Sequence, residues 1–205
     1  AIPVFSVMGI QACPMPTAVL TSQTGFKSFY CNDCTDKLDY YTSEWKKLGF
    51  QPDGIYTGFL SSEKQVDKIL DFINSFETEN TLVLVDPVMG DGGRTYSLFT
   101  DTLACKMKKL VTVADVITPN LTECCILCDV DYCEFIKNAD KPDFLDKIAE
   151  LGKNLLNRYG VKIVIITGIE HKDIDGTMYV QNLIASKDEV FSVSCKKIGG
   201  SYSGT

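Results

Sequence analysis

The chain has almost no histidine and no long hydrophobic run, and each absence excludes a class of protein. Its 205 residues include a single histidine, His171, so a His-rich metal centre is excluded. A Ser-His-Asp triad is not expected either, because no nucleophile-elbow motif accompanies that histidine. No apolar run is long enough to cross a bilayer, so we expect no membrane-spanning helix.

Basic residues are scarce relative to acidic ones. The chain has 20 Lys and Arg against 27 Asp and Glu, which gives a net charge of −7. The sequence contains no basic stripe with interleaved aromatic residues, so nucleic acid is not an expected partner. An acidic protein that binds a polyanion needs a metal ion, a few local bases or helix N-termini to do so.

Cysteine, in contrast, is plentiful. The nine cysteines are an odd number in a sequence without a secretory signal, which favours a reducing cytoplasm over a disulfide framework. Cys31 with Cys34 and Cys125 with Cys128 have CxxC spacing. This spacing suits a zinc site or simply small thiols, and the apolar helical surroundings of the second pair favour thiols.

Strand and helix patterns alternate along the chain. Helical spacing of apolar residues predicts helices over 1–8, 36–48, from Ser62, over 98–110, from Asn120 and over 143–158. Short apolar runs predict strands at 55–58, 82–85, 115–118, 162–166, 177–184 and 189–197, with His171 in a polar turn. This alternation predicts one domain over residues 1–205, an α/β fold with a doubly wound, mainly parallel sheet and helices on both faces.

The most informative segment is the strand end around Asp86. A β-branched apolar run, Leu82 to Val85, leads straight into Asp86, and a second carboxylate, Asp91, follows the turn at Pro87 and Gly90. Parallel sheets place their chemistry just beyond the carboxyl ends of the strands. Two carboxylates there suit Mg²⁺ and the phosphate that it carries, although an Asp-Pro turn with solvated acids is the alternative.

Three further strand ends carry polar or small residues and should share the same edge of the sheet. They are Thr57-Gly58, Thr118 to Glu123, and Thr167-Gly168. In the second of these, Asn120 suits a helix N-cap, and Glu123 falls at the third helical position, as in a capping box. Glu123 therefore has two interpretations, as part of a well-formed helix start or as a group that holds Mg²⁺ directly or through water.

The last residues, Gly199 to Thr205, are rich in glycine and follow a strand. Such a turn offers backbone N–H groups to an anion where it leads into a helix. The sequence contains no Walker-A run, so P-loop chemistry is not indicated, and Gly90-Asp-Gly-Gly does not match the dinucleotide fingerprint.

Together these motifs resemble the ribokinase superfamily and, within it, the pyridoxal kinases of bacterial type that act in vitamin B6 salvage. The matching segments run along the whole chain in the order of the family: Met8–Leu20, Asp53–Leu60, Val85–Asp91, Ile117–Glu123, Ile165–Gly168 and Ser201–Thr205.

The resemblance implies a reaction. ATP would phosphorylate the 5′-hydroxymethyl group of pyridoxal, and of pyridoxine and pyridoxamine, with Mg²⁺ as cofactor and a monovalent cation as an open question. Family members are usually homodimers, so a homodimer is expected. Phosphoryl transfer depends mainly on alignment, Mg²⁺ and N–H groups aimed at the phosphoryl group.

The resemblance also implies roles for individual residues. Asp86 and Glu123 match the acids near the ATP phosphates and Mg²⁺, with Asp91 as a lesser candidate. Thr118, Thr167 and Gly168 match contacts with the nucleotide. Thr24, Gly25 and Phe59 match the pocket of the pyridine ring. Gly204 and Thr205 match the start of the anion hole.

Three departures from the family pattern matter. The family motif continues with Gly-Asp after Gly-Thr, and that Asp accepts the hydroxyl proton, whereas this sequence stops at Thr205. The family's first strand, with its substrate-contacting Ser, is also absent. Thr21-Ser-Gln-Thr24 replaces the usual Ser-Asn-His-Thr. We therefore expect a kinase fragment that turns over poorly as it stands.

Two alternatives stay open at this point. A hydroxymethylpyrimidine kinase of the same superfamily would act on a similar ring with the same kind of hydroxymethyl acceptor. A non-catalytic remnant that binds a vitamer or a nucleotide would share the motifs without the turnover.

Overall fold

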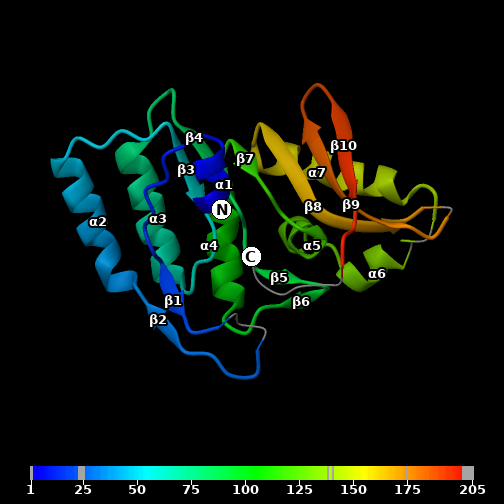
Figure 1. The fold of residues 1–205 in the computed structure, drawn as a ribbon, viewed down its shortest axis with the longest axis horizontal. Helices are drawn as coiled ribbons and strands as arrows, with labels where there is room; N and C mark the ends of the chain where they lie inside the picture. The colour runs from blue at the N-terminus through cyan, green and yellow to red at the C-terminus, as the bar shows by residue number, and fades with distance from the viewer. Residues whose placement is uncertain (1, 23–25, 138, 140, 174, 200–205) are drawn as a thin grey trace.

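A six-stranded mixed sheet forms the centre of the computed structural model, which describes residues 2–22, 26–137, 139, 141–173 and 175–199. The strand order is β10-β9-β8-β7-β4-β3 (Figure 1). Strands β3 (Gly54–Thr57), β4 (Leu82–Val85), β7 (Val116–Ile117) and β8 (Ile163–Lys172) are parallel. Strands β9 (Met178–Ser186) and β10 (Val190–Lys196) continue the sheet in antiparallel fashion. The predicted α/β class with a mainly parallel sheet is confirmed.

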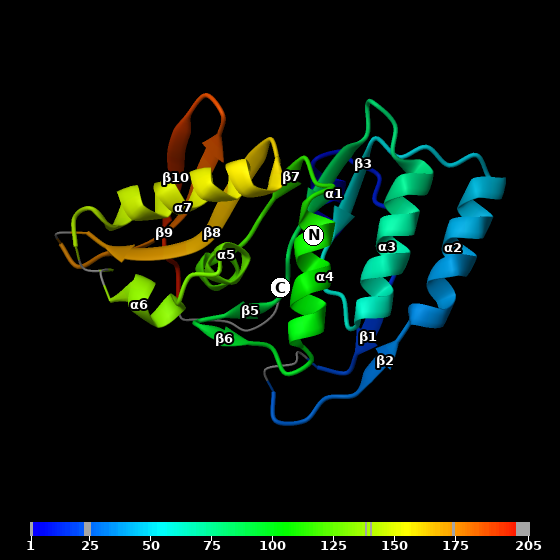
Figure 2. The ribbon, with the colours of Figure 1, turned by 180° about the vertical axis from the view of Figure 1, so that it is seen from behind.

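Most of the helices cover one face of this sheet. The connections between the parallel strands all progress in the same direction along the sheet, so right-handed crossovers place their helices on the same side. These helices are α3 (Glu63–Phe76), α4 (Asp101–Val111), α5 (Leu121–Cys128) and α7 (Phe144–Tyr159), all seen in Figure 2. Alternate strand residues beneath them, such as Val83, Val85 and Val164, are fully buried in one hydrophobic core.

The second face of the sheet is covered by much less helical structure. The short helix α1 (Ile2–Val7) lies there, with the ring of Phe5 edge-on to that of Tyr56 at 6.0 Å. Tyr56 and Leu82 keep 46% and 50% of their surface exposed. The helices predicted for both faces are therefore unevenly distributed over the residues that the structure describes.

Smaller elements complete the fold. Helix α2 (Thr35–Lys47) packs outside α3, and α6 (Tyr132–Ile136) follows α5. Two short antiparallel hairpins, β1 (Ala18–Leu20) with β2 (Cys31–Asp33) and β5 (Gly90–Asp91) with β6 (Arg94–Thr95), lie outside the main sheet. The sequence did not predict α6 or the pairing in these hairpins, because runs of two to five residues carry too little periodicity.

Strand β8 corrects two predictions. It was expected to end at Ile166, with Thr167-Gly168 as its exit and His171 in a turn, but it continues to Lys172. Its pairing with β9 is interrupted by a bulge between Ile166 and Ile169 and then resumes. Gly168 lies in this bulge and has a φ of +71°, which a glycine adopts without strain. The glycine therefore marks a bulge within β8 and not the end of the strand. His171 lies within the strand, with its ring stacked on that of Tyr179 at 5.5 Å.

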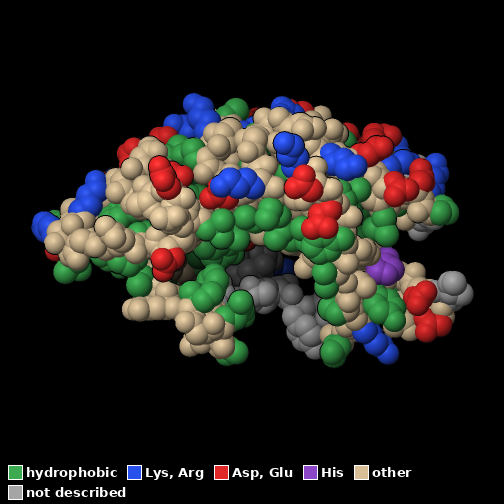
Figure 3. All heavy atoms as spheres, turned by 90° about the horizontal axis from the view of Figure 1, so that it is seen from above, with side chains coloured by type: hydrophobic (Ala, Val, Ile, Leu, Met, Phe, Trp, Pro, Cys, Tyr) green, Lys and Arg blue, Asp and Glu red, His purple; other side chains and the backbone are tan. Residues whose placement is uncertain are grey.

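The distribution of charged side chains on the surface agrees with the absence of a basic stripe from the sequence. Lys and Arg side chains alternate with Asp and Glu on the face shown in Figure 3, without a continuous basic stripe on that face. None of the helices that the structure describes is both long and apolar enough to cross a membrane.

Candidate active site

The four segments that the sequence singled out, three strand ends and the bulge of β8, are joined by backbone hydrogen bonds. The N–H of Asp86 donates to the carbonyl of Thr57 at 2.9 Å, and the N–H of Thr118 donates to that of Val85 at 3.1 Å. The N–H of Thr167 donates to the carbonyl of Pro119 at 2.9 Å. The structure thus brings Asp86, Thr118 and Thr167 to one edge of the sheet. Parallel strands require such convergence at their carboxyl ends.

Asp86 lies at the tip of β4, half-buried. Burial raises the pKa of its carboxyl group to about 6, although hydrogen bonds from the Tyr56 and Thr118 hydroxyls act in the opposite direction. The Tyr56 hydroxyl is 3.4 Å from Oδ2 of Asp86. A partly desolvated carboxylate with few donors around it has unused capacity for a cation.

Glu123 is more enclosed, with 3% of its surface exposed. Its side chain closes the predicted capping box of α5: Oε2 accepts from the N–H of Asn120 at 2.9 Å, and the N–H of Glu123 donates to Asn120 Oδ1 at 3.0 Å. Oε1 accepts from the N–H of Met89 at 3.1 Å. The capping interpretation of Glu123 is therefore confirmed, and the same carboxylate also fixes the loop after β4.

The carboxylates at this edge influence one another. Burial raises the pKa of Glu123 to about 8, with hydrogen bonds from the backbone lowering it and the charge of Asp86 raising it further. Burial also raises the pKa of Tyr96, and the charges of Asp91, Glu123 and Asp86 add to the shift. Tyr96 therefore lies within electrostatic reach of all three acids.

Asp91 lies on the hairpin β5–β6 and is exposed. Its Oδ1 accepts from the N–H of the next residue, Gly92, at 2.8 Å, so the side chain also shapes its own turn. The hairpin is attached to α5 by two hydrogen bonds. Asn120 Nδ2 donates to the carbonyl of Gly90 at 2.8 Å, and the N–H of Gly93 donates to Thr122 Oγ1 at 2.9 Å.

Gly90 is required for this hairpin. A Cβ at this position would lie 2.3 Å from the carbonyl oxygen of Arg94, on the opposite strand. We expect Gly90→Ala to lower the free energy of unfolding by about 2 kcal/mol, because backbone must move to relieve the overlap.

The control for this prediction is Gly58→Ala, where a Cβ would meet no atom within 4 Å. That variant should stay within about 1 kcal/mol of the wild type. Urea unfolding of both variants measures the difference, and equal midpoints would contradict the role assigned to Gly90.

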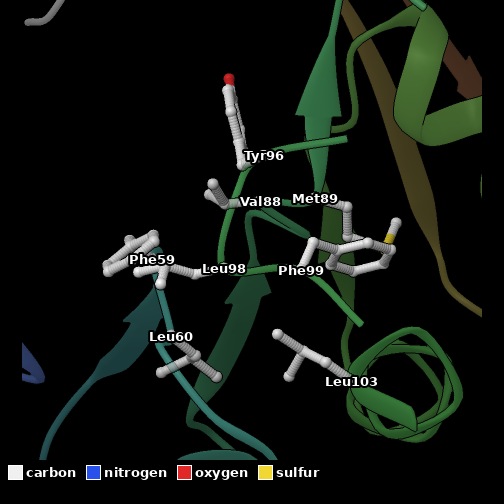
Figure 4. Close-up of a pocket in the computed structure, with 8 residues that line it drawn as sticks. All are labelled: Phe59, Leu60, Val88, Met89, Tyr96, Leu98, Phe99 and Leu103. Atoms are coloured by element: carbon white, nitrogen blue, oxygen red, sulfur yellow. The ribbon is translucent and has the colours of Figure 1, made fainter. Parts of the chain in front are cut away.

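An apolar wall lies beside the carboxylates. Phe59 and Leu60, after β3, face Val88 and Met89, after β4, and Tyr96, Leu98, Phe99 and Leu103 complete the lining (Figure 4). The Tyr96 ring extends outward from this group (Figure 4). The hollow itself is about 10 Å³, which holds little more than a water molecule, so these residues form a wall and not an enclosing pocket.

The carboxylates fit Mg²⁺ only as a partial ligand set. Among the described residues, no group of three or more His, Cys, Asp or Glu side chains could hold a metal ion. Mg²⁺ is commonly bound by one or two carboxylates together with water and substrate phosphates, which suits Asp86. Both oxygens of Glu123 already accept backbone hydrogen bonds, so contact through water suits it better.

Within the described part of the chain, neither CxxC pair belongs to a group of side chains that could hold a zinc ion. All nine cysteines are free thiols. Burial raises the pKa of the Cys125 thiol to about 11, which leaves it protonated at neutral pH.

Some expected residues lie outside the described part of the chain: Thr24, Gly25, Gly204 and Thr205. Conversely, the sequence did not point to Tyr56, Val88, Met89 or Tyr96. Tyr56 had a detectable signal, because it precedes the exit of β3 next to the Asp86 strand. Tyr96 reaches the site only through the hairpin, and nothing in its local sequence marks it.

A mainly parallel sheet with polar strand ends and a neighbouring apolar wall defines a ribokinase-like α/β protein. The chain belongs to the phosphomethylpyrimidine kinase family, whose sequence model matches residues 2–205.

Individual relatives support this membership. A Schizosaccharomyces pombe protein assigned as a pyridoxal kinase is 30% identical over 198 residues, which is 93% of this chain and 54% of that protein. A Bacteroides thetaiotaomicron protein assigned as a phosphomethylpyrimidine kinase and crystallised with pyridoxal has 38% identity and a TM-score of 0.82, over 95% of this chain and 65% of that one. Pyridoxal kinase from Lactobacillus plantarum shares the fold, with a TM-score of 0.78 at 22% identity over 98% of this chain and 67% of that one. The chain thus spans about half the length of its S. pombe relative.

Proposed function

We propose that this chain is part of a kinase that transfers the γ-phosphoryl group of ATP to the 5′-hydroxymethyl group of pyridoxal, and of pyridoxine and pyridoxamine. The observation that carries the proposal is the position of Asp86, a half-buried carboxylate at the edge where three strand ends and the bulge of β8 meet, next to an apolar wall. A kinase of this kind needs a place for Mg²⁺ and phosphate beside a place for an aromatic ring.

The apolar wall is the side proposed for the acceptor. Phe59 and Val88 offer flat and branched apolar surface to a pyridine ring, and Tyr96 connects this wall to the carboxylates. The 38% identical relative that was crystallised with pyridoxal supports a vitamin B6 compound as the acceptor.

The carboxylate side is proposed for Mg²⁺ and ATP. Asp86 would contact the ion, Glu123 would act through water, and Thr118, Thr167 and Gly168 would lie along the nucleotide. A bound Mg²⁺ supplies positive charge to the phosphates. The protein's own contribution is to hold Asp86 in place through the hydroxyls of Tyr56 and Thr118.

A second candidate is phosphorylation of a hydroxymethylpyrimidine, which the family name favours. The two acceptors share a six-membered nitrogen ring with a hydroxymethyl group, so the described wall does not distinguish them. Homodimer formation and a location in the cytoplasm are further proposals, the second supported by nine free thiols.

A substrate panel tests the proposal. The full-length gene product is expected to consume ATP with pyridoxal, pyridoxine or pyridoxamine, at a kcat/KM at least about 100-fold above that for the hydroxymethylpyrimidine. A coupled assay for ADP measures this, with reactions lacking Mg²⁺ as the control. Turnover with the pyrimidine alone would favour the second candidate, and turnover with neither acceptor would refute both.

A further inference from the structure

A fully buried amide side chain lies behind the apolar wall. Gln65, in the first turn of α3, has no exposed surface. Buried amides are retained where their hydrogen bonds are satisfied, because an unpaired donor or acceptor costs free energy. The partners of Gln65 therefore indicate what it holds together.

Gln65 joins three segments that are distant in sequence. Its Oε1 accepts from the N–H of Ser61 at 2.9 Å. Its Nε2 donates to the carbonyl of Thr17 at 2.7 Å and to Oδ2 of Asp33 at 3.2 Å. The first bond is local to the start of α3. The other two reach the residue just before β1, Thr17, and the last residue of β2, Asp33.

Asp33 is the second centre of this network. Its carboxylate accepts from Gln65, from the Ser61 hydroxyl and, through Oδ1, from the N–H of Thr35 at 2.7 Å. Burial alone would raise the pKa of Asp33, but these hydrogen bonds outweigh it and hold the pKa below its usual value. The carboxylate is thus an ionised acceptor for three donors.

The network fixes the backbone on both sides of Leu60, including the carbonyl of Phe59. The Thr17 hydroxyl donates to the carbonyl of Phe59 at 2.7 Å, and the N–H of Ser61 is held by Gln65. Gln65 also donates to the carbonyl of Thr17, so it contacts both residues that make these bonds. Leu60 is therefore flanked by two hydrogen bonds, one made by Gln65 and one made by a residue that Gln65 contacts.

We propose that Gln65 and Asp33 are positioning residues that fix the Phe59–Leu60 segment of the acceptor wall against the hairpin β1–β2. The role in acceptor binding rests on the proposed function, and the fixing of the segment does not. Because the network contacts the wall and none of the carboxylates of the candidate active site, its loss should weaken acceptor binding more than ATP binding.

The experiment compares four variants of the full-length protein. Gln65→Glu places a second carboxylate beside Asp33, and Asp33→Asn removes the ionised acceptor. The double variant Asp33→Asn/Gln65→Glu reverses donor and acceptor and restores one amide–carboxylate bond. Lys64→Gln, at the adjacent exposed position of α3, is the matched control.

For Gln65→Glu we expect the KM for pyridoxal to rise about tenfold, with the KM for ATP within about twofold of the wild type. The double variant should recover at least about threefold of that loss, because the two positions are in contact. Lys64→Gln should match the wild type. A rise in both KM values together, or a double variant that is simply the product of the two single variants, would overturn the positioning role.

Hydrogen exchange measures the fixing without any activity. A peptide covering residues 58–62 should exchange faster in Gln65→Glu than in the wild type and no faster in Lys64→Gln. Unchanged exchange in Gln65→Glu would overturn the inference even in an active kinase. Faster exchange in a protein that phosphorylates no vitamer would keep the fixing of Phe59–Leu60 and remove only the proposed substrate.

Discussion

Replacing Asp86 by asparagine in the full-length protein is expected to lower kcat for Mg²⁺-dependent ATP turnover by about 100-fold or more. The substitution keeps the size of the side chain and its hydrogen bond with Tyr56, but it removes the negative charge at the edge of the sheet. At pH 7.5 the wild-type carboxyl is ionised, because its pKa of about 6 lies below that pH. The coupled assay for ADP measures the loss.

Asp91→Asn is the matched comparison, since it removes the same charge five residues along the chain. Asp91 is exposed and bonded to its own turn, so we expect a loss of less than about tenfold. Burial disfavours the charged form of Asp86, so Asp86→Asn should melt at or above the wild-type temperature at pH 7.5. Full turnover by Asp86→Asn would refute the cation role of this residue.

Replacing Glu123 by alanine is expected to lower the free energy of unfolding by about 3 kcal/mol, more than any other substitution proposed for this protein. The substitution leaves the buried N–H of Met89 and the partly buried N–H of Asn120 without their acceptor. Glu123→Gln keeps one acceptor oxygen and should lose about half as much. Urea unfolding at pH 6 measures both.

Glu134→Ala is the control for Glu123→Ala. Glu134 is an exposed glutamate that pairs with Lys137 one turn along α6, and its loss should cost less than about 0.5 kcal/mol. Equal losses in the two alanine variants would contradict the role of Glu123 in holding Met89 and Asn120.

The pH dependence of stability provides a separate test of Glu123. Its pKa of about 8 in the folded protein lies above the ordinary value of 4.5, so the unfolded chain releases this proton first. The stabilising contribution is therefore complete below pH 4.5 and is lost as the pH rises towards 8. Glu123→Gln should remove this part of the decline, and an unchanged slope would show that other groups cause it.

The site was predictable where one short segment carries both the structural and the chemical signal. The run Leu82 to Val85 predicted strand β4 with the bounds that the structure has, and Asp86 follows it. The capping box of Asn120 and Glu123 was also predictable, because a helix start depends on residues three apart. Convergence of the strand ends followed from parallel pairing alone.

The remainder depends on contacts between distant segments. Gly168 reads as the end of a strand, and only the pairing of β8 with β9 turns it into a bulge. In the sequence, Gln65 looks like an ordinary helical residue. Only the folded structure shows that its side chain bonds to Thr17 and Asp33. Tyr96 reaches the carboxylates through the hairpin β5–β6, whose two-residue strands have no detectable period.

The order of the strands in the main sheet has a consequence for how the protein folds during synthesis. From β3 to β10, each strand pairs with the strand of this sheet that precedes it along the chain. The sheet can therefore grow in one direction as the ribosome releases the chain, and no strand needs to wait for a partner made much later. Pairing of consecutive strands keeps the contact order lower than it would be if the same strands were paired out of chain order. Of the six strands of the main sheet that the structure describes, β10 is then the last to pair.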